Sequence, residues 1–230
     1  MNKFKKIALL AIVCAALGCG SEKPKETADE TASENAGSAE TNTETQQTDT
    51  ATTVTKENFM SFPVTPESEF TGTAYEDGYE IQSCSSKDAV IVVPEEINGL
   101  KVLSIGNYAL CDLECEAIVL PDTVKYIGEA ALSLNSNMKY VYLGNSVENI
   151  GELAFNSDNS LVEINLPEST KSVNQLAAYC KSLERVYAPA GLTDIQYYLL
   201  FECPNATVYT PAGSAAEASA NEAGIPVVNE

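Results

Sequence analysis

Apolar and polar positions alternate over short stretches in the second half of the chain. The clearest example lies within Val147–Ser169, which reads VENIGELAFNSDNSLVEINLPES and contains an L-x-x-L-x-L pattern at Leu161, Ile164 and Leu166. Successive side chains of a β-strand point to opposite sides, so Ile164 and Leu166 face inward and the residues between them face outward. Pro167 then ends the strand, because proline has no N–H for the sheet. This stretch therefore predicts a short strand followed by a turn.

The same unit recurs along the chain in two columns of residues. The first column has intervals of 22, 23, 23 and 22 residues and consists of Ile105-Gly106, Ile127-Gly128, Ile150-Gly151, Val173-Asn174 and Ile195-Gln196. The second column has intervals of 23, 23, 22 and 22 residues and consists of Pro121, Gly144, Pro167, Pro189 and Pro211. Repeats of this length, with strand-like alternation inside each copy, predict a stacked solenoid of about five coils.

The combined pattern resembles a known family of repeats. V-x-x-I-G-x-x-A-F, followed by L-x-x-V-x-L-P, is similar to the BspA-type leucine-rich repeats of bacterial surface lipoproteins, and the resemblance covers roughly residues 70–230. It implies a repeat solenoid that is mainly β, with leucine-rich repeats over residues 101–211. It also implies an adhesive or recognition role at the cell surface.

Segments on either side of the repeats are expected to cap the two ends of the solenoid. At the N-terminal side, residues 57–100 contain Phe70–Tyr75 and Tyr79–Cys84 around a Glu-Asp-Gly turn, which predicts a β-hairpin. At the C-terminal side, residues 212–230 contain an alanine-rich stretch with Ser214 as N-cap and Gly224 as its stop, which predicts a helix followed by a closing strand. A solenoid needs such caps because its terminal coils otherwise expose their apolar edges.

The N-terminus has the features of a secretory signal. Residues 1–18 combine a basic start with a short apolar run, and Ala16-Leu17-Gly18-Cys19 resembles the motif at which bacterial lipoproteins are cleaved and lipidated, which makes Cys19 the predicted lipid-bearing residue. The alternative is a plain signal peptide cleaved near Gly18. Residues 19–56 are acidic and rich in Ser and Thr, so we expect a disordered tether that holds the domain away from the membrane.

Composition narrows the possible functions. The net charge is −20, which disfavours nucleic acid and adsorption to anionic membrane, so contact with the membrane is expected through the lipid anchor only. The chain has no histidine, and it lacks the motifs of nucleophilic, phosphate-binding or zinc sites. We therefore expect no catalytic residue, no metal site and no cofactor. The pairing of the five cysteines that follow residue 56 stays open.

If the strands stack in register, their outward positions place aromatic and charged side chains on one surface. The candidate binding face consists of Tyr140, Tyr142, Glu163, Asn165, Arg185, Tyr187 and Tyr209. Tyrosine and arginine are favoured in interfaces. The alternative is that the tyrosines only stabilise the sheet through cross-strand pairing.

These observations favour a non-enzymatic, lipid-anchored surface protein whose repeat domain binds an extracellular protein or glycan. The alternative is a structural or envelope-assembly lipoprotein with no external ligand. That alternative gains weight if the N-terminal cap covers the tyrosines.

Overall fold

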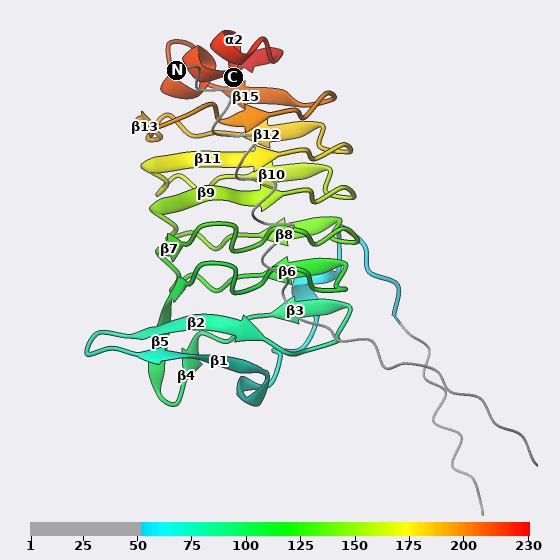
Figure 1. Ribbon diagram of the computed structural model, residues 1–230, viewed down its shortest axis with the longest axis vertical. Helices are drawn as coiled ribbons and strands as arrows, with labels where there is room; N and C mark the ends of the chain where they lie inside the picture. Colours follow the sequence, from blue (N-terminus) through cyan, green and yellow to red (C-terminus); the bar gives the residue numbers. More distant parts are fainter. Residues whose placement is uncertain (1–51) are drawn as a thin grey trace, which may run out of the picture. The chain divides into compact units, whose positions relative to one another are not determined.

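Short parallel strands stack one above another and form a solenoid of about seven turns (Figure 1). The structure is a computed structural model that describes residues 52–230, and these form one unit from Thr53 onward. The predicted fold class, a mainly β repeat solenoid, is confirmed. The predicted count of about five coils is too low.

One side of the solenoid carries two sheets of parallel strands, which together we call the strand face. The first sheet consists of β3 (Val90–Val92), β6 (Ala117–Val119) and β8 (Tyr140–Tyr142). The second consists of β10 (Glu163–Asn165), β12 (Arg185–Tyr187), β15 (Thr207–Thr210) and β16 (Val227–Asn229). β3 and β16 extend the stack beyond the sequence repeats at both ends, which accounts for the extra turns.

The second side carries a nine-stranded sheet within residues 52–230, which we call the lateral sheet. Its strands are β1 (Phe70–Ala74), β2 (Tyr79–Cys84), β4 (Glu96–Ile97), β5 (Leu100–Ile105), β7 (Tyr126–Ile127), β9 (Asn149–Asn156), β11 (Ser172–Ala178), β13 (Asp194–Ile195) and β14 (Leu200–Phe201). The first sequence column forms one ladder of this sheet, because Ile105, Ile127, Ile150, Val173 and Ile195 are paired in that order.

The core lies between the two sides and runs the length of the stack. Inward residues of the strand face, such as Ile118, Ile164 and Val186, are fully buried against the isoleucine ladder of the lateral sheet. Phe155 is also fully buried, at the end of β9. Each coil contributes only a few apolar side chains, so a continuous core requires the neighbouring coils.

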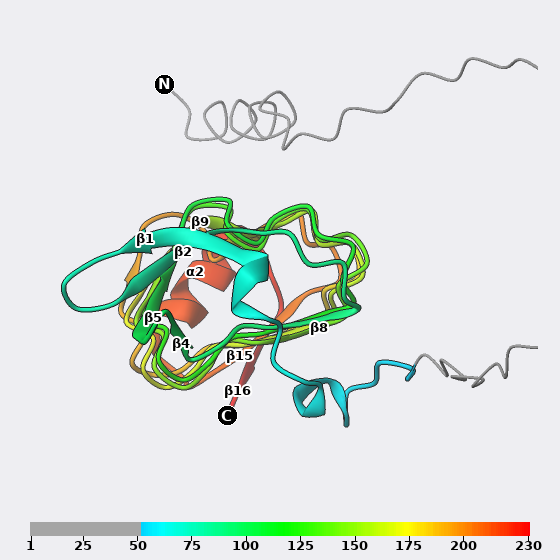
Figure 2. The same cartoon turned by 90° about the horizontal axis from the view of Figure 1, so that it is seen from below.

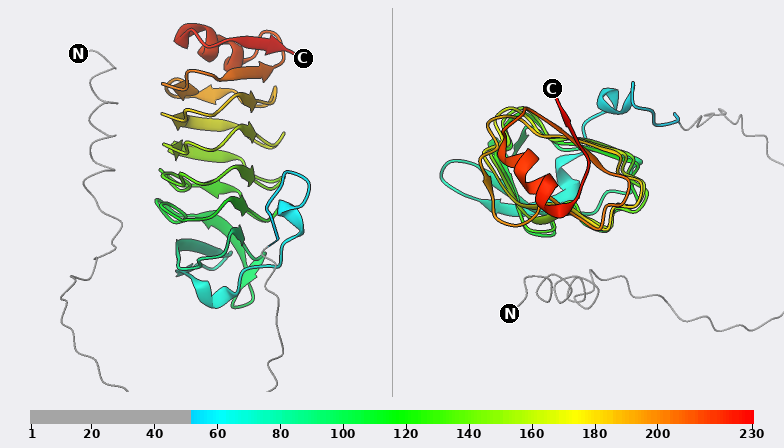
Figure 3. Two further views of the ribbon diagram at one scale, coloured as in Figure 1. Left: turned by 90° about the vertical axis from the view of Figure 1, so that its right-hand side faces the viewer. Right: turned by 90° about the horizontal axis from the view of Figure 1, so that it is seen from above.

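The ends of the stack are covered by local elements that the turn and cap residues determine. β1 and β2 form an antiparallel hairpin that lies across one end of the stack (Figure 2). The helix α2 (Ala215–Ala223) begins after Ser214, whose hydroxyl accepts a hydrogen bond from the Glu217 N–H, and ends at Gly224 with φ 71°. It lies across the other end, against β15 (Figure 3). Two short 3-10 helices, η1 (Phe59–Ser61) and η2 (Glu67–Glu69), precede the hairpin.

The glycines of the first sequence column are required by the close approach of successive coils. A Cβ on Gly128 would lie 2.5 Å from Asn107 Oδ1 and 2.7 Å from Asn107 N. A Cβ on Gly151 would lie 2.6 Å from Glu129 N. Both glycines contact the preceding coil, and any side chain there would separate the two coils.

We therefore expect Gly128→Ala to lower the free energy of unfolding by about 1–3 kcal/mol, the usual cost of overpacking. The measurement is urea unfolding followed by far-UV circular dichroism. Gly191→Ala is the matched control, because its Cβ would meet its nearest neighbour, Glu168 O, at 3.3 Å and its φ is not positive. Equal destabilisation by the two variants would contradict this explanation of the glycine column.

Candidate functional site

The outward residues of the strand face are aligned as the spacing predicts. In the first sheet Ala117 is paired with Tyr140 and Val119 with Tyr142. In the second sheet one column consists of Glu163, Arg185 and Thr207, and the other of Asn165, Tyr187 and Tyr209. The predicted candidate residues therefore project from neighbouring strands of the same surface.

Residues 53–62, which we call the N-terminal segment, lie against one part of this surface (Figure 3, cyan). The sequence predicts a disordered tether up to residue 56, and that boundary is wrong for its last residues. Val54 is 5% exposed and packs with Phe59 on the outer side of β3 and β6. Val54 is the one branched aliphatic residue of the stretch, and it is buried because the first strands offer an apolar outer surface.

This apolar outer surface forms a second, smaller core outside the solenoid. Val90, Val92, Ala117 and Val119 are outward residues, yet all are buried under the N-terminal segment. The ring of Phe59 extends the cover to β8, where it stacks on Tyr140 at a centroid distance of 5.4 Å and an interplanar angle of 19°. Apolar residues at outward positions were a sequence signal that this end of the face is covered.

Lys56 connects the N-terminal segment to the second sheet of the strand face, through a contact with Glu163 on β10. Its Nζ lies 2.9 Å from Glu163 Oε1, and the same carboxylate accepts hydrogen bonds from Arg185 Nε at 2.9 Å and from Asn165 Nδ2 at 2.9 Å. Partial burial by itself would raise the pKa of Glu163, but the hydrogen bonds from Lys56, Asn165 and Arg185 outweigh it and lower that pKa to about 2. Glu163 is therefore ionised at neutral pH and fully engaged in intramolecular contacts.

The strand ladder is interrupted beneath this contact. β8 and β10 belong to different sheets, and a cavity of about 250 Å³ opens between them. Its walls include Tyr140, Glu163, Asn165 and Arg185 of the predicted face, together with Lys56 and Phe59. Four predicted residues are thus brought together, and the N-terminal segment, which the sequence did not place here, bridges the interruption.

The remaining three tyrosines of the predicted face have different surroundings. Tyr142 is held in place, since its hydroxyl donates to Asp122 Oδ1 at 3.1 Å and accepts from Asn145 Nδ2 at 2.8 Å. Burial raises the pKa of Tyr142, and the hydrogen bond to Asp122 adds to that effect. Tyr187 and Tyr209 are stacked with a centroid distance of 4.8 Å and an interplanar angle of 27°. Both are half-buried, and they lie beyond the contacts of the N-terminal segment.

Cysteine thiols and the carboxyl group of Asp158 lie inside the solenoid. The five cysteines of residues 52–230 are free thiols, and four of them are buried. Burial raises the pKa of Cys115 to about 12, and burial also raises the pKa of Asp158 well above its usual value. Within the same residues there is no cluster of side chains suited to a metal ion, and no helix has the length and apolar character needed to cross a membrane.

Comparison with known proteins identifies the class of this chain. The sequence model described as "BspA type Leucine rich repeat region" matches residues 102–217 in six copies. This chain therefore belongs to the BspA-type leucine-rich repeat family, and the predicted resemblance is confirmed. No protein of curated function is similar enough to be counted as a match.

One solved structure shows the same fold, and two further leucine-rich repeat structures are less similar. A leucine-rich repeat protein of T. pallidum is 22% identical with a TM-score of 0.56, over 64% of this chain and 71% of that one. A leucine-rich repeat protein from Bacteroides capillosus is 24% identical with a TM-score of 0.47, over 52% and 93% of the two chains. A leucine rich cell surface protein from Faecalibacterium prausnitzii is 22% identical with a TM-score of 0.49, over 64% and 38%.

The contact between Lys56 and Glu163 is expected to depend on pH. Because the pKa of Glu163 is lower in the fold than its usual 4.5, its contribution is complete above pH 4.5 and is lost as pH falls through about 2. The chain has no tryptophan, so Phe59→Trp introduces a single reporter next to Tyr140. We expect its emission to shift to the red between pH 4.5 and 2.

The control for this titration is the double variant Phe59→Trp/Glu163→Gln, in which the red shift is expected at neutral pH and no longer depends on acid. Far-UV circular dichroism of both proteins over the same range separates local release from unfolding of the solenoid. An identical acid titration in the two variants would show that Glu163 does not hold the segment.

Proposed function

We propose that this protein is a non-enzymatic, lipid-anchored surface protein that recognises an extracellular protein or glycan with the uncovered part of its strand face. The observation that carries the proposal is the stacked pair Tyr187 and Tyr209, which lies on the part of the face that the N-terminal segment leaves open. Asn165, in the same column, is exposed. Two aromatic rings beside an exposed amide are suited to a sugar ring or to an apolar side chain of a protein.

The size of this open part indicates the strength of binding. Three strands at about 4.8 Å spacing, paired over three residues each, make a patch roughly 10 Å wide and roughly 10 Å long. Its area of roughly 100 Å² is far smaller than the roughly 800 Å² that each partner buries in a standard protein interface. A single domain is therefore expected to bind weakly. Many copies anchored on one surface would bind a multivalent target much more tightly, because the second contact becomes intramolecular.

A structural or envelope-assembly role is the second candidate, and one observation favours it. Phe59 covers Tyr140, and Glu163 and Arg185 are occupied by intramolecular ion pairs, so part of the predicted face already has a partner within the chain. The surface location itself is supported by the family to which the chain belongs.

The recognition proposal is tested with the double variant Tyr187→Ala/Tyr209→Ala on arrays of glycans and extracellular matrix proteins. We expect at least a tenfold loss of binding to at least one target of the full chain, because the stacked platform is removed. Tyr75→Ala/Tyr197→Ala is the matched control, since those tyrosines are exposed and lie outside the strand face. Equal binding of every target by the two double variants would reject this surface, and binding to no target would favour the structural role.

The anchor is tested separately with Cys19→Ser. We expect the full chain to partition into the detergent phase of Triton X-114 and to incorporate labelled fatty acid, whereas the variant does neither, since several acyl chains on one residue provide stable anchoring. Cys14→Ser is the matched control within the apolar run of the predicted signal. Fatty acid incorporation by the Cys19→Ser variant would contradict the proposed lipidation site.

A further inference from the structure

The outer surface of the lateral sheet contains a hollow of about 610 Å³. We call it the lateral groove. It extends over β2, β5, β7, β9 and β11 and reaches Gln196 after β13. Six neighbouring coil positions at about 4.8 Å spacing give it a length of roughly 24 Å.

The floor of the lateral groove is open because side chains are missing there. Gly106, Gly128 and Gly151 line it, and the close contact between coils excludes a Cβ at Gly128 and Gly151. Coil packing therefore explains the hollow. Coil packing does not explain which side chains surround the hollow. Those side chains point outward, so the close contact between coils does not restrict them.

The side chains that line the groove are almost all neutral, and most of them are polar. The polar residues include the amides Gln82, Asn107, Asn149, Asn174 and Gln196, and Glu80 is the one charged residue among those that line the groove. The chain as a whole has a net charge of −20, and charged residues make up 20% of it. A neutral lining in such an acidic protein is suited to a ligand that has no charge and many hydrogen-bonding groups.

Four side chains of the groove add further features of a binding surface. Tyr126 is 49% exposed on β7, near the middle of the groove, and offers a ring on which a flat apolar surface can stack. Asn174 Oδ1 has no hydrogen-bond partner within the described chain although the atom is shielded from water. Asn149 Nδ2 donates to Ser172 Oγ at 2.6 Å, so this pair of side chains is held in a fixed arrangement.

We infer that the lateral groove binds an extended, uncharged polysaccharide, with one sugar unit on each coil. Sugar hydroxyls both donate and accept hydrogen bonds, as side-chain amides do, and the apolar face of a pyranose ring stacks on tyrosine. The spacing of the coils, about 4.8 Å, is close to the length of one sugar in an extended β-linked chain. An anionic polymer is disfavoured by the charge of the protein.

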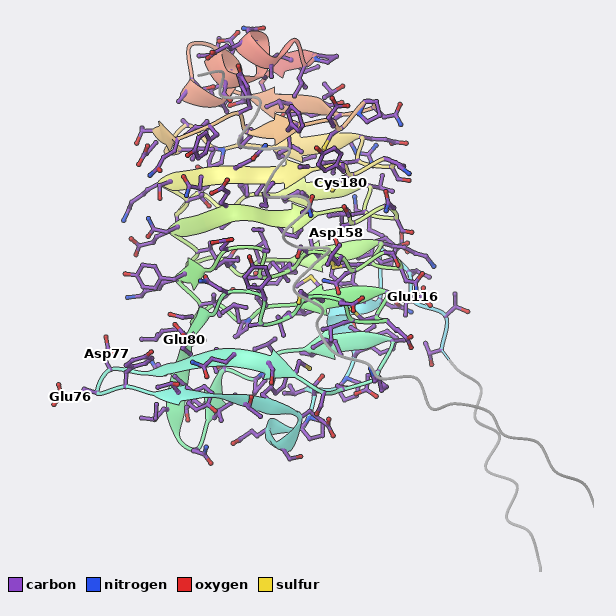
Figure 4. All side chains as sticks on the ribbon, in the orientation of Figure 1. Glu76, Asp77, Glu80, Glu116, Asp158 and Cys180 are labelled. Carbon is purple, nitrogen blue, oxygen red and sulfur yellow. The ribbon has the colours of Figure 1, made fainter. Side chains whose placement is uncertain are left out.

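This site is separate from the strand face. Glu80, at one end of the groove, lies on the opposite side of the solenoid from Glu116, whose carboxylate pairs with Lys139 beside β8 (Figure 4). The inference therefore does not depend on Tyr187 and Tyr209. Either surface can fail its test while the other passes.

The test is isothermal titration calorimetry of the full chain with cellohexaose and chitohexaose, which are neutral, extended and β-linked. We expect saturable binding of at least one of them. Tyr126→Ala is expected to weaken it at least tenfold, equivalent to about 1.4 kcal/mol, and Tyr126→Phe to preserve it, because the stacking ring is retained. Since Tyr126 is half exposed, its replacement is expected to leave the circular dichroism spectrum unchanged.

Two sets of controls make the result specific. Tyr75→Ala, at the turn of the β1–β2 hairpin and outside the residues that line the groove, and Tyr187→Ala, on the strand face, are expected to leave sugar binding unchanged. Maltohexaose, whose α-linkages curve the chain, is expected to bind at least tenfold more weakly. Absence of saturable binding by both extended sugars would overturn the inference. Equal losses in Tyr126→Ala and Tyr75→Ala, equal binding of maltohexaose, or preferential binding of a neutral unstructured hexapeptide would also overturn it.

Discussion

The close stacking of successive coils is the constraint on which the rest of this structure depends. A single coil buries too little apolar surface to fold alone, and it becomes stable only when its inward residues join those of the coils on both sides. The contact is so tight that Gly128 and Gly151 have no room for a Cβ. Both ends of the stack must then be closed, by the β1–β2 hairpin and by α2.

The same stacking turns a sequence repeat into ordered surfaces. Residues 22 or 23 positions apart are brought to one strand spacing from each other, so each column of the sequence becomes a row of side chains on the protein. On the strand face the outward side chains differ in polarity and in coverage from one end of the row to the other. It is apolar and covered at β3 and β6, bridged by Lys56 and Phe59 at the interruption between β8 and β10, and open at Tyr187 and Tyr209.

Charge and size together suggest how such a small domain functions. The chain is strongly acidic, yet the lateral groove is lined by amides and the open strand face by tyrosines, so neither surface is built to attract a charged partner. Both are small, and weak contacts of this kind become effective when many copies are anchored side by side. The proposed lipid anchor and the two separate neutral surfaces would together suit recognition of repetitive, uncharged material outside the cell.

The sequence by itself determined the fold, the register and the caps, because these depend on local periodicity and on residues such as Ile150, Pro167, Ser214 and Gly224 that act within their own coil or turn. It did not determine the number of turns, since β3 and β16 lack the repeat motif and join the stack only through pairing with it. Nor did it place the N-terminal segment. Lys56 and Glu163 are 107 residues apart, and no periodicity connects them. Such a contact is decided by the tertiary structure, which alone brings an apolar outer surface and the carboxylate of Glu163 within reach of the same short segment.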